Sequence, residues 1–273
     1  YDRRQRPQAL KYRDSLFLVF NGNASDMTEK PKTYPMIASF NLKTKKFGLE
    51  FNLDTIVSSD HHHCPIFWID NKKRFNIIYG AHNSSGHHLI SENEKSIGNS
   101  YLDWVKKPFL NTKVSYPSYL KSLFGDVVYF REYGHTGHWK YALRSPETGF
   151  WNIIEEPITN LDKEGMFEWS SYHSVILGEN KKFLHVAFVS YDDNKENNPG
   201  RYFNERYNKI VTNDFKYNLY YLKVDIRTNK VYNFDGKQLK LPIDLYTANN
   251  ECLIWNTQGR GSGIPPEIII DKN

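Results

Sequence analysis

The histidines of this sequence gather in one stretch, in a way that indicates proton-transfer or metal chemistry. Eight of the ten lie between positions 61 and 138, at residues 61, 62, 63, 82, 87, 88, 135 and 138. Imidazole gains and loses a proton near neutral pH, and it is the commonest metal ligand in proteins. For His61, His63, His87 and His88, a place on solvated loops is the simpler interpretation.

His62 and His82 stand apart because they flank an expected pair of β-strands. Residues 64–71 and 75–79 are rich in apolar side chains and are separated by a short polar turn. His62 therefore precedes the first strand, and His82 follows the second. Because a hairpin returns the chain to the side from which it started, we expect both imidazoles at the same end of one sheet.

Later strand pairs carry polar side chains at the same places. Tyr116 lies at the start of the next pair, Arg131 at its end, and Tyr172 at the start of the pair after that. Such a set suits removal of a proton next to a carboxylate, followed by loss of the β-substituent. Arginine offsets the carboxylate charge, histidine or tyrosine takes the proton, and a tyrosine hydroxyl protonates the leaving oxygen. Either His62 or Tyr172 could be the base, and ordinary strand packing is the alternative role for each tyrosine.

The elements that would position these residues recur along the chain. Apolar strand pairs alternate with hairpins whose turns resemble one another, at residues 41–47, 145–151 and 225–232. A repeat of roughly 50 residues is typical of a four-stranded propeller blade. We therefore predict an all-β fold, a β-propeller, with blades near residues 14–53, 64–110, 116–157 and 172–240. An irregular β-sandwich is the alternative, since it also has short strands with turns at intervals.

The end of the chain predicts a further blade. Residues 266–271 (PEIIID) repeat the pattern of residues 65–70 (PIFWID). We expect residues 1–273 to form a single propeller domain that is incomplete at its C-terminus. It would contain about four blades and the start of a fifth, out of about seven in the complete protein. Because an unpaired blade edge invites aggregation, a further C-terminal segment or a second chain is expected to complete the ring.

Composition restricts the partners of such a fold. The net charge of +5 is not gathered in lysine and arginine blocks, which argues against a nucleic-acid surface and favours a polyanionic sugar. No run of 18 apolar residues exists, so no membrane-spanning helix is expected. Cys64 and Cys252 do not have the spacing of a metal-binding motif, and the pair neither requires nor excludes one disulfide bond. Because the chain begins at Tyr1 and not at methionine, we expect a removed signal peptide and a secreted or periplasmic protein.

Several of these motifs, in this order, resemble the signature of the BNR-repeat family that contains the propeller-type ulvan lyases. Residues 60–65 (DHHHCP) and 79–82 (YGAH) are similar to the two histidine motifs of that family. The resemblance covers most of the chain, because it continues through residues 115–117, 129–131, 172–173 and 184–187. It implies a polysaccharide lyase that cleaves ulvan, a sulfated polymer of rhamnose and uronic acid, at the uronate by β-elimination.

The resemblance also implies roles for individual residues. Carried over by position, the active-site residues are His62, His82, Tyr116, Arg131 and Tyr172. Among them, Tyr116 matches the catalytic tyrosine and Arg131 matches the arginine that neutralises the carboxylate. We expect additional substrate contacts from His63, His173 and Arg201.

The sequence departs from the family pattern at two points. His63 stands where asparagine is usual, and the structural zinc site of the family is poorly matched. His135 is a candidate first ligand, but the later ligand stretch reads YNLY at residues 217–220, which offers neither thiolate nor imidazole. We expect no catalytic metal, because Arg131 and His82 supply positive charge, while a structural zinc or calcium ion is left open.

Two other functions fit a propeller of this composition. A sialidase-like glycoside hydrolase would also bind a carboxylate and would need an arginine triad and a Tyr/Glu nucleophile pair, but the sequence has no Arg-Ile-Pro start and no clean Asp-box repeats. A non-catalytic carbohydrate-binding propeller would use the aromatic side chains equally well. For the lyase, we expect an anionic, ulvan-like polysaccharide as the partner, and neither nucleic acid nor membrane.

Overall fold

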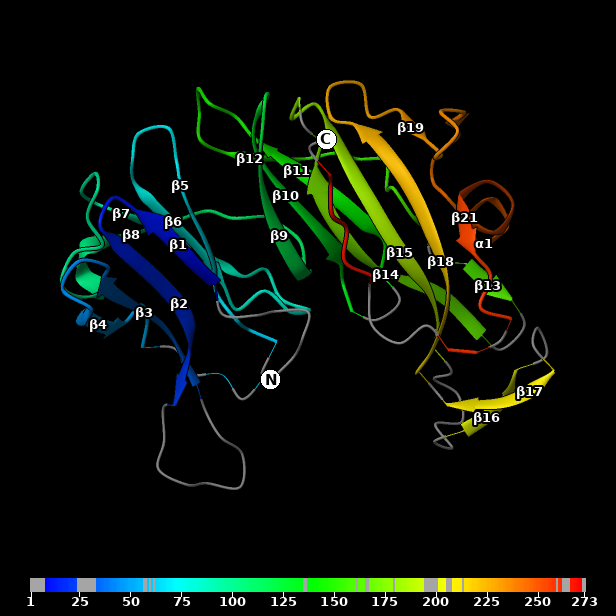
Figure 1. Ribbon diagram of the computed structural model, residues 1–273, viewed down its shortest axis with the longest axis horizontal. Helices are drawn as coiled ribbons and strands as arrows, with labels where there is room; N and C mark the ends of the chain where they lie inside the picture. Colours follow the sequence, from blue (N-terminus) through cyan, green and yellow to red (C-terminus); the bar gives the residue numbers. More distant parts are fainter. Residues whose placement is uncertain are drawn as a thin grey trace. The chain divides into compact units, whose positions relative to one another are not determined.

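The structure is a computed structural model in which β-strands dominate (Figure 1). It describes residues 8–23, 33–55, 58, 60, 62–134, 137–160, 162–164, 167–178, 180–193, 201–204, 208–212, 214–258, 260–261 and 266–271. The chain divides into two compact units, Tyr1–Tyr119 and Leu120–Asn273, and each unit is described by itself. Among the helices of these described residues, none has the length and apolar character needed to cross a membrane.

The first unit holds two four-stranded antiparallel sheets whose strands neighbour one another in chain order (Figure 1). The first sheet consists of β1 (Gln8–Tyr12), β2 (Ser15–Asn23), β3 (Thr33–Asn41) and β4 (Lys46–Asn52). The second consists of β5 (Ile66–Ile69), β6 (Phe75–Tyr79), β7 (His87–Ser91) and β8 (Trp104–Lys107), with a 3-10 turn, η1 (Tyr101–Asp103), before its last strand.

Both sheets of the first unit contribute to one hydrophobic core. The buried side chains of this core include Phe17 and Ile37 from the first sheet and Phe75 and Ile77 from the second. The rings of Phe17 and Phe75 meet edge to face, with their centroids 4.8 Å apart. This packing holds β5 and β6 in place. The loop before β5 and the loop after β6 are therefore both attached to fixed strands.

The third sheet has the order β12–β11–β10–β9. Its strands are β9 (Val114–Ser122), β10 (Gly125–Glu132), β11 (Trp139–Arg144) and β12 (Trp151–Ile153). The boundary between the two units falls inside β9. A separate two-stranded hairpin, β16 (Arg201–Asn204) and β17 (Lys209–Thr212), lies further along the chain.

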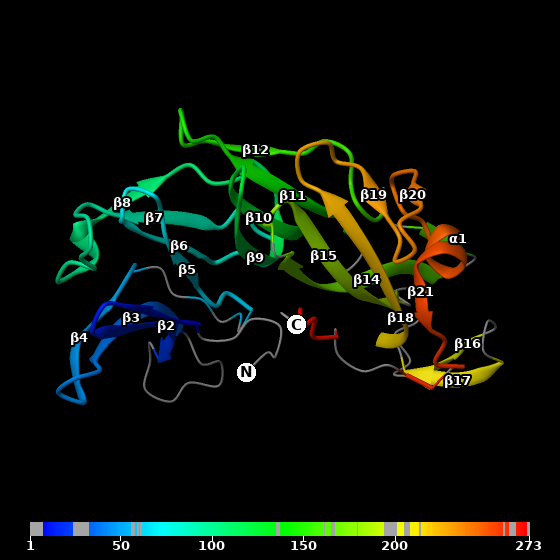
Figure 2. The ribbon, with the colours of Figure 1, turned by 45° about the horizontal axis from the view of Figure 1, so that its top comes forward.

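The fourth sheet is built on three long strands that lie side by side in Figures 1 and 2. These strands are β14 (Phe167–Leu177), β15 (Phe183–Asp193) and β18 (Asp214–Asp225). Shorter strands extend the sheet, namely β13 (Asp162–Glu164), β19 (Val231–Tyr232), β20 (Gln238–Leu239) and β21 (Leu253–Trp255). A single helical turn, α1 (Leu245–Thr247), and the π-type turn η3 (Ala248–Cys252) precede β21.

Three hairpins share one turn geometry, as the sequence predicts. Their turns begin at Asn41, Ser145 and Asp225. In each turn, the carbonyl of the first residue accepts a backbone hydrogen bond of 2.9 Å from the N–H four residues later. The first side chain also accepts backbone hydrogen bonds, which is how Asn, Ser and Asp stabilise turns. The fifth residue of each turn has a positive φ angle. The repeated hairpin is therefore a property of the fold.

The observed sheets agree with the expected boundaries for the second and third blades, whereas the fourth sheet spans residues 162–255 against the predicted 172–240. The second and third sheets span residues 66–107 and 114–153, against the predicted 64–110 and 116–157. The first sheet begins earlier than predicted, at Gln8, because β1 pairs with β2 from Gln8 to Tyr12. The all-β class is confirmed, and the four-stranded sheets follow one another along the chain as blades do.

Three expectations about strand ends need correction. The sequence places Tyr172 at the start of a strand, but Tyr172 lies in the middle of β14, because β14 begins at Phe167 and pairs with β15 along its length. Tyr116 is likewise the third residue of β9 and does not precede it. Residues 266–271 form no strand, although they repeat the pattern of residues 65–70. The earlier pattern forms β5 because β6 pairs with it, and a strand needs such a partner.

Candidate functional site

The loop before β5 is folded around the carboxylate of Asp60. The backbone N–H of His62 donates to Asp60 Oδ1 at 2.9 Å, which closes an Asx-type turn over two residues. The backbone N–H of Asp60 donates to Ser58 Oγ at 3.0 Å, and the N–H of His63 donates to the Asp60 carbonyl at 3.2 Å. These short-range bonds place the Asp60 side chain beside the imidazole of His62.

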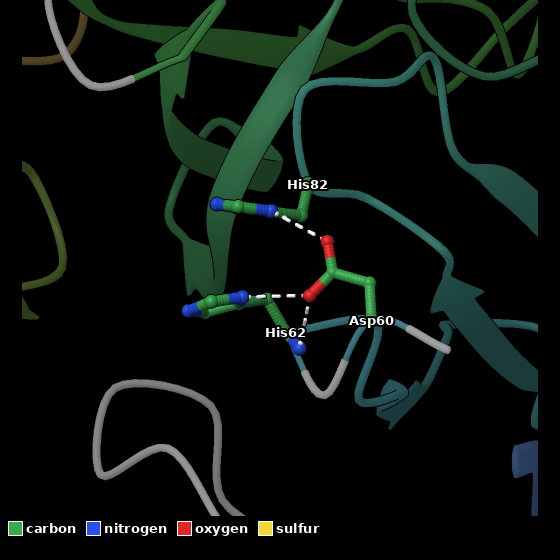
Figure 3. A group of neighbouring side chains, drawn as sticks. All are labelled: Asp60, His62 and His82. Carbon is green, nitrogen blue, oxygen red and sulfur yellow. Dashed lines mark hydrogen bonds and ion pairs between the residues drawn. The ribbon is translucent and has the colours of Figure 1, made fainter. Parts of the chain in front are cut away.

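The same carboxylate holds a second imidazole that comes from the loop after β6. Asp60 Oδ1 lies 2.7 Å from His62 Nδ1, and Asp60 Oδ2 lies 2.8 Å from His82 Nδ1. The two rings are stacked, with centroids 4.1 Å apart and planes 22° from parallel. Figure 3 shows both rings extending from the carboxylate to the same side. One aspartate therefore aligns two histidines.

Electrostatics fix the protonation of this arrangement. Burial by itself would raise the pKa of Asp60, but hydrogen bonds from the His62 backbone and from the rings of His82 and His62 outweigh it. With the added charge of His82, they lower the pKa of Asp60 well below its usual value. An ionised carboxylate only accepts hydrogen bonds, so both Nδ1 atoms must donate. In a neutral imidazole held in this way, Nε2 carries the lone pair and can take up a proton.

Tyr116 completes this group of side chains in the first unit. Its ring centroid lies 5.8 Å from that of His62 and 5.2 Å from that of His82. Tyr116 is 5% exposed, and its φ angle of 54° lies in the left-handed region, which is uncommon for a bulky residue. Backbone strain of this kind concentrates at functional sites. We call Asp60, His62, His82 and Tyr116 the histidine cluster.

Tyr116 is tied to the loop that carries His82. The backbone N–H of Asn83 donates to Ser115 Oγ at 2.9 Å, and the N–H of Val114 donates to the Ser84 carbonyl at 2.7 Å. The residues directly after His82 are thus bonded to the residues directly before Tyr116. Relative movement of the two backbone segments would have to break these bonds.

The histidine cluster also has the residue types of a metal site. Within the described part of the chain, Asp60, His62 and His82 each offer one atom that could bind a metal ion, and these three atoms lie within 4.8 Å of one another. Both Nδ1 atoms, however, are already hydrogen bonded to the carboxylate. A metal ion held by all three would have to replace both of these bonds.

His63 lies beside this cluster and not within it. Its Nδ1 is 2.6 Å from Ser58 Oγ, and its Nε2 is 3.7 Å from Asp60 Oδ2. With Ser58, Tyr79 and His87 it lines a cavity of about 190 Å³ in the first unit. A substrate contact through His63 stays a prediction, and such a contact would lie in this cavity.

The second unit brings Arg131 and Tyr172 together with two residues that the sequence reasoning missed. The guanidinium carbon of Arg131 lies 4.8 Å from the centroid of the Tyr172 ring. The Nζ atom of Lys216 lies 5.4 Å from the same centroid and 5.1 Å from that of Tyr191. The two tyrosine rings are 5.1 Å apart. We call these four residues the tyrosine–cation cluster.

Burial differs within the tyrosine–cation cluster. Arg131 is 0% exposed, while Tyr172 and Tyr191 are 2% and 3% exposed. Lys216 is only partly buried. A carboxylate from solution can therefore meet the Arg131 guanidinium only after neighbouring side chains move. Cations near aromatic rings are attracted by the electrons of the ring faces, which helps to hold both side chains in this cluster.

His173 follows Tyr172 in β14 but points to the opposite face of the sheet, as successive strand residues do. Its Nδ1 is 2.6 Å from the Tyr129 hydroxyl, and its Nε2 is 2.7 Å from Ser171 Oγ. Its ring stacks on Trp139 with centroids 4.3 Å apart. Desolvation by burial, followed by the charge of Arg131, lowers the pKa of His173 well below its usual value. Both ring nitrogens are already engaged, and a substrate contact through His173 stays a prediction.

The remaining expected site residues, His135 and Arg201, and the two cysteines lie outside both clusters or outside the described residues. His135 lies outside the described residues. Arg201 begins β16, but its side chain lies outside the described part of the structure. Cys64 and Cys252 are not part of a disulfide bond. Burial, followed by the charge of Glu251, raises the pKa of Cys252 to about 12, so it stays protonated.

The stretch at residues 217–220 does not fit a zinc ion. Asn218 and Thr257 are joined by two hydrogen bonds. The backbone N–H of Asn218 donates to Thr257 Oγ1 at 3.2 Å, and the backbone N–H of Thr257 donates to Asn218 Oδ1 at 3.0 Å. The Tyr220 hydroxyl donates to Asn249 Oδ1 at 2.7 Å. These buried groups are amides and hydroxyls, whereas structural zinc is bound by thiolates and imidazoles. Polar side chains bond to one another where the family resemblance implies a metal.

The structure thus forms two clusters, each within one unit. His62, His82 and Tyr116 come together in the first unit, and Arg131 and Tyr172 come together in the second. That the two clusters share one site stays a prediction. Asp60 could have been recognised from the sequence, because a carboxylate two residues before a histidine can both form a turn and orient the ring. Lys216 gave no such signal.

Comparison with known proteins places the chain in a family. The model of the BNR repeat-containing family matches residues 28–271. A curated ulvan lyase from Alteromonas sp. (strain LOR) is 24% identical over 283 residues, covering 93% of this chain and 53% of the relative. The protein named Ulvan Lyase-PL25 from Pseudoalteromonas sp. (strain PLSV) is 23% identical over 263 residues, covering 87% of this chain and 51% of the relative. The chain therefore spans about half the length of these relatives.

A solved structure supports the fold. The polysaccharide lyase PL25 ulvan lyase bound to -[GlcA(1-4)Rha3S]- aligns with a TM-score of 0.72 at 18% identity, covering 93% of this chain and 59% of that chain. At this level of identity the likeness shows the fold, so the predicted β-propeller class is confirmed. Since the family model covers most of the sequence, this chain belongs to the BNR repeat-containing family.

Proposed function

We propose that this protein is a polysaccharide lyase that cleaves ulvan, or a closely similar uronate polymer, by β-elimination. The observation that carries the proposal is the histidine cluster, in which one carboxylate aligns two stacked imidazoles beside a tyrosine. This arrangement offers a base and an acid within one cluster. The similarity to two curated ulvan lyases supports the choice of polymer.

In the proposed reaction, His62 removes the proton from the carbon next to the uronate carboxylate. The electron pair of that C–H bond forms the new carbon–carbon double bond as the bond to the glycosidic oxygen breaks. Tyr116 then gives its hydroxyl proton to the departing oxygen, so atoms and charge balance. Asp60 keeps the Nδ1 proton of His62 in place, which leaves Nε2 to act as the base. His82 adds a second donor or a positive charge beside the base.

For the tyrosine–cation cluster we propose substrate binding. Arg131 would neutralise the uronate carboxylate, since its planar fork can make two parallel hydrogen bonds to such a group. Tyr172, whose ring contacts the guanidinium, would position that fork and remains the alternative base. These assignments rest on the side chains present and on the resemblance of residues 129–131 and 172–173 to the family.

The proposed mechanism needs no metal, and it implies where the protein works. Because positive charge comes from arginine and histidine, a chelator should leave the rate unchanged.

Ulvan is a large polymer that cannot enter a cell unaided, so we infer that the protein is secreted or periplasmic.

The test follows the product of the purified protein acting on ulvan. Elimination creates a double bond conjugated to the carboxylate, so ultraviolet absorbance should rise in step with new chain ends. Hydrolysis would create reducing ends without that absorbance, and a binding protein would create neither. Chain ends without a rise in absorbance would overturn the proposal in favour of a hydrolase.

A further inference from the structure

Lys216 lies over the ring of Tyr172, which Arg131 also contacts, because of an irregularity in β18. From Phe183 to Phe188, residues of β15 pair with residues of β18 in one register, which ends at the pair Phe188 and Tyr220. Beyond this point the pairing resumes with Ser190 opposite Tyr217. Two residues of β18 thus oppose one residue of β15, which is a β-bulge.

The bulge changes which face of the sheet Lys216 occupies. Side chains alternate between the two faces of a strand, so a one-residue shift moves every later side chain to the other face. With the bulge, Lys216 pairs directly with Tyr191. In the register before the bulge, Tyr217 would have opposed Tyr191, and Lys216 would have pointed to the other side. The extra residue therefore brings an ammonium group to Tyr191 and Tyr172.

Asn218 holds the bulge in place. Its φ angle of 57° lies in the left-handed region, which Asn tolerates better than most residues. It is 3% exposed, and its side chain is bonded both to Thr257, at 3.0 Å, and to the Tyr220 hydroxyl, at 3.0 Å. Bulges of this kind re-aim side chains and are frequent next to active sites. The position of Lys216 is thus fixed by a buried, bonded element.

Two cations then share one aromatic ring. The Arg131 guanidinium carbon and Lys216 Nζ lie 4.8 Å and 5.4 Å from the Tyr172 centroid, so they are at most about 10 Å apart, the sum of the two distances. Like charges this close repel each other, and an anion that meets both relieves the repulsion. Lys216 is the partly exposed member of the pair, so it is the one closer to solvent.

We propose that Lys216 is a specificity residue that binds the sulfate of the sugar next to the uronate. This inference rests on the proposed function, because it assumes that Arg131 takes the carboxylate of the same polymer. The ligand in the related solved structure, -[GlcA(1-4)Rha3S]-, alternates a carboxylate with a sulfate. A lysine ammonium is a compact point charge with rotatable donors, which can bind a tetrahedral sulfate from several directions, and the planar arginine fork is left to match the carboxylate.

Lys223 provides a matched control. It lies on the same strand and the same face as Lys216, on the other side of the bulge. Its Nζ atom is also placed over aromatic rings, 5.1 Å from Phe183 and 5.7 Å from Tyr232. Lys223→Met therefore removes an equal charge in a similar setting away from Tyr172.

The experiment measures kcat and KM of the wild type, Lys216→Met, Lys216→Arg and Lys223→Met on ulvan and on chemically desulfated ulvan. A charged hydrogen bond contributes roughly 1.5–3 kcal/mol, so KM of Lys216→Met on ulvan should rise about tenfold to a hundredfold. We expect kcat to stay nearly unchanged, Lys216→Arg to restore most of the affinity, and Lys223→Met to match the wild type. On desulfated ulvan, the wild type and Lys216→Met should have equal KM.

Binding of the same two polymers, measured by affinity electrophoresis, separates this inference from the proposed function. If the wild type forms no unsaturated product, the lyase proposal fails. The role of Lys216 is still decided by binding, because the wild type should bind ulvan more tightly than Lys216→Met does, while the two should bind desulfated ulvan equally. Equal binding of ulvan by the wild type and Lys216→Met would overturn the inference. An equal loss on ulvan and on desulfated ulvan would also overturn it, because Lys216 would then bind something other than sulfate.

Discussion

The two clusters position their residues by different means. The histidine cluster draws Asp60, His62 and His82 from loops at strand ends, and hydrogen bonds to one carboxylate align them. In the tyrosine–cation cluster, Arg131, Tyr172, Tyr191 and Lys216 all lie within strands, and sheet register aligns them. In the proposed reaction, the first cluster holds the groups that exchange protons, while the second holds the cations that bind the substrate.

This difference predicts how each cluster fails. Replacing one member of the histidine cluster should change the chemistry or its pH dependence, because its geometry depends on which atoms carry protons. Replacing a cation in the other cluster should weaken the binding or the charge neutralisation of the substrate with little change in pH dependence, because the strands keep the remaining residues in place. The following variants test this division, from the largest expected effect to the smallest.

The largest effect is expected for Tyr116→Phe. The substitution removes the hydroxyl that would protonate the leaving oxygen and keeps the ring beside His62 and His82. Loss of a positioned acid lowers the rate by about 10² to 10⁴. Initial rates from product absorbance measure this loss, and a melting curve close to that of the wild type serves as the control. A rate within a few-fold of the wild type would remove Tyr116 from the chemistry.

Arg131→Lys should have the next largest effect. A lysine keeps the charge but cannot make the two parallel hydrogen bonds of the guanidinium. Loss of one donor that stabilises developing charge costs about 10² to 10³ in rate. Kinetics on ulvan should show this loss with little change in the optimum pH. Wild-type kinetics for Arg131→Lys would show that the carboxylate is neutralised elsewhere.

Asp60→Asn should lower the rate by about 10², the scale on which small misplacements of catalytic groups act. An amide oxygen can accept from one imidazole, but its NH₂ group cannot accept from the other, so one ring must change its tautomer or its position. We expect the pH profile of kcat to shift as well, because the carboxylate charge beside both rings is lost. An unchanged pH profile with a lower melting temperature would make Asp60 a purely structural residue.

The smallest effect concerns stability in acid. The pKa of Asp60 is lower in the folded protein than its ordinary value of about 3.9. Its contribution to folding is therefore present above that ordinary value and is lost as the pH falls towards the folded pKa. Melting temperatures measured across this acidic range should fall less steeply for Asp60→Asn than for the wild type. Parallel curves for the two proteins would contradict the lowered pKa.

Local sequence patterns were sufficient to predict much of the fold. The second sheet follows from residues 64–110, because each of its strands pairs with its neighbour in the chain and each turn has its own polar residues. Positions of His62 and His82 beside β5 and β6 follow for the same reason. The start of β14 could not be predicted, since it depends on pairing with β13 and on the length of β15.

The missed site residues depend on contacts that leave little trace in sequence. Asp60 meets His82 across 22 positions, and this pairing exists only once β5 and β6 have formed their hairpin. Lys216 reaches Tyr191 through one extra residue in β18, and strict alternation would place it on the wrong face. A residue such as Asn218, which tolerates a positive φ angle within a strand, is the available hint of a bulge.

The most direct test of the central claim, that His62 and Tyr116 form one acid–base unit, is a double-variant measurement. His62→Ala, Tyr116→Phe and the combined variant would be compared with the wild type on the same ulvan, by absorbance of the unsaturated product, with melting curves for each. We expect each single variant to be slower by at least about 10². The combined variant should be little slower than the worse of the two, because residues that act as a unit are not additive. Near-normal rates in both single variants, or losses that simply multiply in the combined variant, would contradict the claim.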